Sequence, residues 1–428
     1  MPENIRETAF AMETSSIKFG PGVTREVGFE MASLGAKKTM VVTDQQMAVL
    51  QPVSIVMESL KAAGIDAVLF DQVSVEPTDV SFKQAIAFAV DGNFDSYVAV
   101  GGGSSIDTAK AANLYATYPA DFLTYVNAPI GKGELVPGRL KPLIAIPTTT
   151  GTGSETTGVA IFDLLEMKAK TGISHRSLRP IMGIVDPDNT VTQPSMVTAC
   201  SGFDVLSHGL ESYTALPFSR REAPEHPGAR PGYQGSNPIS DIWSLKAIEM
   251  VSQNMYRAVL DAADTEARGQ MALAATFAGV GFGNAGCHLP HGMSYPVAGM
   301  VREFAPDGYP SGHPIVPHGM SVILNSPAVF RFTAQTDPER HLHAAMLMGA
   351  DVSDVGLEDA GDVLGDTIVT FIQDMGLPNG LGAVGYSSDD VPSLVQGTLP
   401  QHRVTKLSPR SAGVDELTQL FQDSLTLW

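Results

Sequence analysis

Short apolar runs alternate with helical patterns over roughly the first 190 residues, and this alternation limits the possible folds more than any other feature. Short strands separated by amphipathic helices are typical of βαβ units, which build a parallel sheet. We therefore expect residues 1–194 to form an α/β domain around a parallel sheet. The strand-like runs cover residues 40–43, 67–70, 97–100, 143–146 and 184–187, and the helical patterns cover about 53–63, about 79–90 and the residues from Ser104 onward.

The pattern changes after about Ser195, where long helical stretches replace the alternation. A chain of 428 residues, 43% of them hydrophobic, can fill two ordinary cores, so a second domain is expected. We predict that residues 195–428 form an all-α domain, interrupted by loops at 218–237 and 304–317. The predicted helices cover residues 195–215, 240–262, 266–281, 355–375 and 414–426.

The net charge of −19 limits the possible partners. Nucleic acid binding needs clustered cations, so we expect no nucleic acid partner. An anionic substrate would need positive charge supplied within its own site, for example by a metal ion. The chain has no run of 18 apolar residues, so we expect no transmembrane helix and no membrane partner.

Cysteine usage and the N-terminal residues bear on the compartment. Cys200 and Cys287 lie outside any CxxC pattern, so we expect no disulfide and a reducing environment. Residues 1–19 carry acids and no apolar run, which predicts neither a signal peptide nor an Arg-rich transit peptide. We expect a cytoplasmic protein, or a mitochondrial matrix protein if the source is eukaryotic and a transit peptide has been removed. A homodimer or higher homo-oligomer is expected, because such assemblies are common among soluble proteins.

Two loops that follow strands have features of a phosphate site. Gly101–Ser105 reads Gly-Gly-Gly-Ser-Ser between a strand and a helix, where close backbone approach and free N–H groups suit a pyrophosphate. Pro147–Glu155 follows another strand and carries five hydroxyls and two glycines. A tight turn or a helix cap would explain either loop alone. Because ligands gather at the carboxyl edge of open α/β sheets, the pair predicts a Rossmann-like dinucleotide-binding domain.

Asp44 stands at the end of the first strand-like run. Its carboxylate could accept hydrogen bonds from ribose hydroxyls and would repel a 2′-phosphate, which favours NAD over NADP. The alternative is an aspartate that caps a turn or a helix.

Four residues of the helical half have the pattern of a metal site. Asp204 and His208 are four residues apart, so on a helix both side chains point to one face. His291 and His318 each occur in the tetrapeptide Pro-His-Gly-Met. Any one histidine is readily explained by packing, but three imidazoles and a carboxylate suit a divalent first-row metal. These donors do not separate iron from zinc.

A dinucleotide site together with a divalent metal is typical of hydride transfer, in which the metal lowers the pKa of a substrate hydroxyl. The glycine loop through Asp107, the Thr/Gly loop, the Asp204/His208 pair and the two His-Gly segments together resemble the iron-containing alcohol dehydrogenases. That resemblance covers nearly the whole chain, and it implies a dehydroquinate synthase-like helical domain. The segments 233–243, 281–286, 291–296 and 397–401 resemble the hydroxyacid–oxoacid transhydrogenase branch.

The resemblance implies roles for individual residues. Asp204, His208, His291 and His318 would bind ferrous iron, with zinc as the alternative. Retained NAD(H) would be reduced by 4-hydroxybutyrate, leaving succinic semialdehyde, and reoxidised by 2-oxoglutarate, leaving 2-hydroxyglutarate. The catalytic residues that we assign are His291, Tyr295 and His288. The implied dinucleotide contacts are Asp44, Gly102, Gly103, Ser104, Asp107, Thr148, Thr149, Thr152 and Lys170.

The sequence departs from the family pattern in two places. A second histidine commonly follows the third ligand by four residues, and here Tyr295 stands there, so we expect Tyr295 to replace it as proton donor. The stretch from His291 to His318 is also longer than usual. A dicarboxylate substrate needs cations, of which arginine can bind a carboxylate with two hydrogen bonds. The candidates are Arg220, Arg221, Arg230, Arg302, His313 and His288.

Three other functions remain open from the sequence. The first is an ordinary NAD-dependent iron-containing alcohol dehydrogenase whose cofactor exchanges freely with solution, acting on an alcohol. The second is a lyase that uses the same cofactor and metal transiently, although the chain lacks an evident basic phosphate pocket. The third is a non-enzymatic scaffold with a closed, structural metal site, which would have four protein ligands and no water.

Overall fold

The computed structural model describes residues 6–167, 169–309 and 314–428, and it divides into two compact units. One unit is Glu13–Gln193, and the other is Pro194–Trp428 together with the segment up to Met12. The sequence prediction placed the division after residue 194 and assigned the first twelve residues to the α/β half. The structure differs on this segment, which groups with the helical unit.

Contacts of the N-terminal segment explain this difference. The carboxylate of Glu7 pairs with Arg230 at 3.0 Å. The backbone of Ala11 exchanges two hydrogen bonds with the side-chain amide of Gln234, at 2.8 and 2.9 Å. These partners lie in a loop of the helical unit, more than 200 residues away in the chain, so the contacts form only after that unit folds.

The Glu13–Gln193 unit contains a six-stranded, wholly parallel sheet in the order β1-β8-β5-β4-β2-β3. This confirms the predicted α/β architecture. The strands are β1 (Ser16–Phe19), β2 (Lys38–Val42), β3 (Asp66–Phe70), β4 (Ser96–Gly101), β5 (Leu143–Pro147) and β8 (Met182–Val185). The helices are α1 (Val27–Ser33), α2 (Gln51–Ala62), α3 (Asp79–Gly92) and α4 (Gly103–Thr117).

Alternate residues of the central strands build one core on each face of the sheet. Val41 and Val98 belong to the core that includes α1 and α2. Met40 and Ala99 belong to the core that includes α3 and α4. Parallel strands covered by helices on both faces are expected to be continuously apolar, which is why these strands were visible in the sequence.

A two-stranded antiparallel hairpin was not predicted. Its strands are β6 (Val159–Leu164) and β7 (Ala169–Ser174). Phe162 and Ile173 share a buried cluster with Leu114 of α4, so the hairpin covers one side of that helix.

The strand order brings the predicted nucleotide segments together. β2, β4 and β5 are adjacent in the sheet, and they end beside Asp44, the glycine loop and the Thr/Gly loop. The chain also reverses direction across the sheet here, because β3 lies on one side of β2 and β4 on the other. Such a switch point is where open α/β sheets bind ligands.

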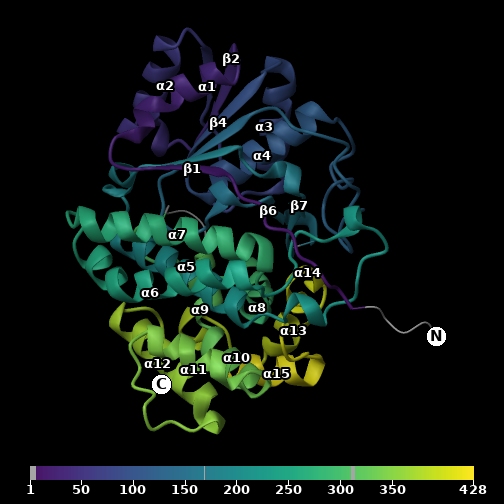
Figure 1. Ribbon diagram of the computed structural model, residues 1–428, viewed down its shortest axis with the longest axis vertical. Coiled ribbons are helices and arrows are strands. Elements are labelled where there is room, and N and C mark those ends of the chain that lie inside the picture. Colours follow the sequence, from purple (N-terminus) through teal and green to yellow (C-terminus); the bar gives the residue numbers. More distant parts are fainter. Residues whose placement is uncertain (1–5, 168, 310–313) are drawn as a thin grey trace. The chain divides into compact units, whose positions relative to one another are not determined.

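The other unit is built from helices. Its long helices α5, α6 and α7 contact one another extensively and share a buried core with the helices that follow (Figure 1). Among the described residues, no helix is long and apolar enough to cross a lipid bilayer. The helices are α5 (Ser195–Thr214), α6 (Pro238–Leu260), α7 (Thr265–Ala285), α8 (Leu289–Gly299), α9 (His318–Ile323), α10 (Ser326–Thr333), α11 (Pro338–Leu347), α12 (Ala360–Asp374), α13 (Val391–Thr398), α14 (His402–Thr405) and α15 (Val414–Asp423).

Candidate functional site

The glycine loop and the Thr/Gly loop lie against each other at the carboxyl edge of the sheet. The backbone N–H of Thr148 donates to the carbonyl of Gly101 over 3.1 Å. A Cβ added at Gly103 would lie 2.7 Å from Cγ2 of Thr152, closer than real Cβ atoms approach. Glycine at this position therefore allows the two loops to touch at the N-terminus of α4. The first N–H groups of that helix have no partners within it, and they favour a bound phosphate.

The remaining loop residues predicted to contact the dinucleotide lie beside this contact. A Cβ at Gly102 would lie 3.2 Å from Oγ1 of Thr149. The hydroxyl of Ser104 accepts a hydrogen bond from the backbone N–H of Glu76 over 3.2 Å. Gly102, Ser104 and Thr149 are all partly exposed, as a ligand-binding surface requires.

Asp44 lies at the end of β2 and caps the turn that follows it. Its Oδ1 accepts hydrogen bonds from the N–H groups of Gln46 and Met47, both over 2.9 Å. A carboxylate has a second oxygen for a ribose hydroxyl, so capping and the predicted cofactor contact are compatible.

Asp107 and Lys170 have partners inside the protein. The Asp107 carboxylate accepts from the hydroxyl of Ser154 over 2.6 Å, which ties α4 to the Thr/Gly loop. The ammonium of Lys170, on β7, lies 2.7 Å from Glu76 and 3.0 Å from Asp163. The structure thus shows bracing roles for these two residues, and their contact with the dinucleotide remains a prediction.

The four predicted metal ligands converge within the helical unit. The Nε2 atoms of His208, His291 and His318 each lie 3.6 Å from Oδ1 of Asp204. The aspartate and His208 lie one turn apart on α5, while α8 carries His291 and α9 begins at His318. Residues spread over more than 110 positions therefore gather around the Asp204 carboxylate, and the donor atoms of Asp204, His291 and His318 all lie within 4.8 Å of one another.

These distances fit a metal better than a hydrogen-bonded cluster. At 3.6 Å the imidazoles are too far from the carboxylate for hydrogen bonds. Donors about 2.1 Å from one tetrahedral ion lie about 3.4 Å from each other, which is close to the distance from the carboxylate to each imidazole. Oδ1 of Asp204 and Nε2 of His291 are buried without a hydrogen-bond partner, an arrangement that a bound cation would correct.

The environment sets the charge of the donors. Burial lowers the pKa of His208 to about 3, so its ring is neutral at pH 7, as a ligand must be. Burial alone would raise the pKa of Asp204, but His208, His318 and His291 outweigh it and hold that pKa below its usual value. An ionised carboxylate beside neutral imidazole suits a divalent cation.

One side of the cluster is more open than the rest. The side chains of Asp204, His208 and His291 are 4–5% exposed, whereas that of His318 is 27% exposed. A structural metal site is closed on all sides, while a catalytic site keeps a position for water or substrate. The exposure therefore favours a catalytic site over the scaffold hypothesis.

Close helix packing brings His318 to the cluster. A Cβ added at the next residue, Gly319, would lie 1.9 Å from the backbone carbonyl oxygen of Cys200 on α5. Only glycine permits this approach of α9 to α5, which explains the His-Gly sequence at this ligand.

Glu211 belongs to the site and was not assigned a role from the sequence. It is fully buried on α5, seven residues after Asp204. Its Oε1 lies 2.5 Å from Nδ1 of His291, and its Oε2 accepts from the backbone N–H of His288 over 2.7 Å. Burial would raise the pKa of Glu211, but His291 lowers it below the usual value. The carboxylate thus holds Nδ1–H of His291 and leaves Nε2 for the metal.

His288 does not supply the positive charge that was predicted for it. Its side chain is fully buried, and its Nε2 lies 3.0 Å from the hydroxyl of Thr214. Burial lowers its pKa to about 4, so the ring is neutral at pH 7. It cannot attract a substrate carboxylate, and this correction follows from the cost of burying a charge.

The arginines predicted to bind a substrate carboxylate have other partners. Arg230 pairs with Glu7 at 3.0 Å, and Arg302 pairs with Asp390 at 2.7 Å. Arg221 donates to a backbone carbonyl over 3.0 Å. The two other candidates are Arg220, which is exposed, and His313, which lies outside the described residues.

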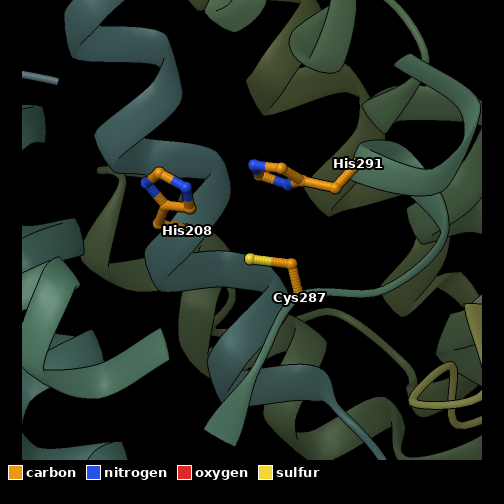
Figure 2. Close-up of side chains that lie close together, drawn as sticks. All are labelled: His208, Cys287 and His291. Carbon is orange, nitrogen blue, oxygen red and sulfur yellow. The ribbon is translucent and has the colours of Figure 1, made fainter. Parts of the chain in front are cut away.

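Two further residues near the metal ligands, Tyr295 and Cys287, have reactive side chains. Tyr295 lies one turn after His291 on α8, and its hydroxyl accepts a hydrogen bond from Nη2 of Arg403 over 2.6 Å. Figure 2 shows the sulfur of Cys287 beside the rings of His208 and His291, and these three residues have donor atoms within 4.8 Å of one another. Burial raises the pKa of Cys287 to about 11, so it is a neutral thiol at pH 7.

Comparison with known proteins agrees with the family resemblance seen in the sequence motifs. The model of the iron-containing alcohol dehydrogenase family matches residues 14–187, and its C-terminal counterpart matches residues 233–425. Hydroxyacid-oxoacid transhydrogenase, mitochondrial, from Mus musculus is 56% identical over 422 residues, which is 98% of this chain and 91% of that protein.

The chain belongs to the iron-containing alcohol dehydrogenase family.

Solved structures of other proteins have the same fold. 1,3-Propanediol oxidoreductase superposes with a TM-score of 0.85 at 27% identity, over 97% of this chain and 100% of that one. Sulfoacetaldehyde reductase from Bifidobacterium kashiwanohense, solved with NAD+, gives a TM-score of 0.79 at 23% identity, over 98% and 99% of the two chains. Family membership confirms the resemblance found in the motifs and makes the protein an oxidoreductase. It also supports the use of a metal and NAD(H).

Proposed function

We propose that this protein is a hydroxyacid–oxoacid transhydrogenase. It moves hydride from 4-hydroxybutyrate to 2-oxoglutarate through bound NAD(H), giving succinic semialdehyde and 2-hydroxyglutarate. The observation that carries this proposal is the 56% identity with the mouse transhydrogenase over 98% of the chain. The approach of three imidazoles to the Asp204 carboxylate supports a metal centre of the kind that the reaction requires.

Each part of the metal site has a task in this reaction. A divalent metal bound by the aspartate and the three imidazoles would lower the pKa of a substrate hydroxyl and polarise a carbonyl. Ferrous iron is the metal that we propose, with zinc as the alternative that these donors also accept. Glu211 orients His291, and the more exposed side at His318 admits the substrate. Tyr295 is the candidate proton donor on α8.

The nucleotide would bind at the carboxyl edge of the sheet, where the two loops meet. It would stay bound while one substrate leaves and the other enters, because hydride must be stored between the two half-reactions. The residues proposed to contact or position it are Asp44, Gly102, Gly103, Ser104, Asp107, Thr148, Thr149, Thr152 and Lys170.

The test is turnover without added nicotinamide. Anaerobically purified protein is given 4-hydroxybutyrate and 2-oxoglutarate, and both products are measured by chromatography. A transhydrogenase forms succinic semialdehyde and 2-hydroxyglutarate in equal amounts over many turnovers. Formation of neither product rejects the proposal.

An ordinary NAD-dependent alcohol dehydrogenase would behave differently. With added NAD+ and 4-hydroxybutyrate alone, it would give a steady rise of NADH absorbance, whereas a retained cofactor gives one turnover and stops. We further propose a homodimeric or larger assembly, and a mitochondrial matrix location if the source is eukaryotic, since the mouse relative is named mitochondrial.

A further inference from the structure

Arg403 is a half-buried cation that lacks an anionic partner. It lies on α14, with Nη2 bound to the hydroxyl of Tyr295 and with its guanidinium carbon 5.0 Å from the ring centroid of Tyr233. Its Nη1 is buried without a well-formed hydrogen bond, and the guanidinium also interacts with the side chain of Tyr233. Among the residues that the structure describes, no carboxylate lies within ion-pair distance of it. Burial raises the pKa of Tyr233 to about 12, so that neighbour is neutral at pH 7.

A second arginine of the same unit, Arg340, has the carboxylate partner that Arg403 lacks. Arg340 is also half-buried and packs on a tyrosine ring, with its guanidinium carbon 3.8 Å from the centroid of Tyr213. Unlike Arg403, it has a carboxylate, Asp241, at 2.8 Å. Buried charges are normally paired because desolvation is costly, so the unpaired guanidinium indicates a place for an anion.

This cation lies close to the metal cluster. Tyr295, its hydrogen-bond partner, follows His291 by one turn of α8, a rise of about 5.4 Å. A Cβ added at Gly292 would lie 2.6 Å from Cγ2 of Thr405, so α14 packs directly on the turn that carries this ligand. Arg403 is therefore held, through Tyr295, against the helix that carries the ligand His291.

We propose that Arg403 binds the substrate carboxylate that lies three carbon–carbon bonds from the reacting carbon. This inference rests on the proposed function. In 4-hydroxybutyrate and succinic semialdehyde, two methylene groups separate the reacting carbon from the carboxylate. In 2-oxoglutarate and 2-hydroxyglutarate, two methylene groups separate the reacting carbon from the distal carboxylate. One fixed guanidinium thus serves both half-reactions with the reacting carbon held at the same place.

The test compares substrates with and without that carboxylate. Binding of 2-oxoglutarate and of 2-oxopentanoate, which has a methyl group in place of the distal carboxylate, is measured by calorimetry on the metal-loaded holoenzyme. The wild-type protein binds 2-oxoglutarate more tightly. In Arg403→Met this affinity falls by about 100-fold, as expected for a lost charged hydrogen-bond pair, while 2-oxopentanoate binds as before. Equal loss for both ligands, or no loss, overturns the assignment.

Two further variants keep the result interpretable. Arg410→Met removes another arginine that lies over an aromatic ring, 4.0 Å from the centroid of Phe332, and it leaves 2-oxoglutarate binding unchanged. Arg403→Lys retains the charge and loses the planar fork, so its affinity falls by less than that of the Met variant, and it provides the measurement if Arg403→Met does not fold. Failure of the wild-type protein to prefer 2-oxoglutarate rejects this proposal. Catalysis without added nicotinamide, measured separately, decides the proposed function.

Discussion

Replacing Glu211 with glutamine tests whether this carboxylate prepares His291 to bind metal. Both carboxylate oxygens accept hydrogen bonds, Oε1 from Nδ1–H of His291 at 2.5 Å and Oε2 from the N–H of His288 at 2.7 Å. A glutamine side chain has one accepting oxygen and one donating NH2 group. Whichever way it turns, a donor faces one of these two N–H groups, and the change also removes a buried negative charge.

The expected losses follow from these contacts. Mutation of a carboxylate that orients a metal-bound histidine typically weakens metal binding by about 10–100-fold, or about 1.4–2.8 kcal/mol. One buried donor left unsatisfied costs about 1–3 kcal/mol of folding free energy in the metal-free protein. We therefore expect Glu211→Gln to fold, to melt at a lower temperature and to bind metal more weakly.

Chelator competition under anaerobic conditions measures the metal affinity, and thermal unfolding of the metal-free protein measures stability. Glu58→Gln makes the same chemical change at an exposed position on α2, and both quantities should stay at their wild-type values. Wild-type metal affinity in Glu211→Gln would refute the reasoning, because it would mean that His291 needs no carboxylate to present Nε2.

Three further outcomes are expected. Gly319→Ala places a methyl group 1.9 Å from the carbonyl oxygen of Cys200, so α9 must shift, and bound metal, measured by mass spectrometry, should fall together with thermal stability. Gly103→Ala, whose Cβ would meet Thr152 at 2.7 Å, should weaken NAD+ binding by about 10-fold in a fluorescence titration and leave metal content unchanged. In the metal-free protein, burial opposes the charge of His291, but the ionised carboxylate of Glu211 stabilises that charge, and the pKa of His291 lies well above its usual value. Metal must then displace a proton, so metal affinity should fall as pH is lowered from about 8 to about 6, and a pH-independent affinity would contradict this.

The sequence predicted best those elements whose pattern of apolar residues matches their burial in the folded protein. β4 and β5 are buried on both faces, so their apolar runs marked them directly. The predicted helix 195–215 corresponds to α5, Ser195–Thr214. A helix of this length repeats its apolar spacing over several turns, so the helical period is visible in the sequence. The spacing of Asp204 and His208 placed both on one face of that helix, and this geometry needs no tertiary information.

Other parts depend on contacts that only the fold creates. The hairpin of β6 and β7 escaped prediction because only alternate residues of β6 are buried. α9 has six residues and α14 has four, too few to show a helical period. The sequence gives no sign of the role of Glu211, since its partner His291 lies 80 residues away.

Arg403 was overlooked for the same reason. Its partner Tyr295 is 108 residues away, and arginines in the Pro/Gly-rich loops were more conspicuous candidates. Those arginines include Arg230, which binds Glu7 and so fastens the N-terminal segment to the helical unit. A charged residue in a loop gives no sign in the sequence of whether its partner is a ligand or another part of the chain.

The central claim is that one divalent metal is held jointly by Asp204, His208, His291 and His318. The most direct test is the metal-to-chain ratio of anaerobically purified protein, compared between wild type, His208→Ala and His226→Ala, which changes an exposed histidine. The account predicts one metal per chain in the wild type and in His226→Ala, and none in a folded His208→Ala. A full complement of metal in His208→Ala would contradict it.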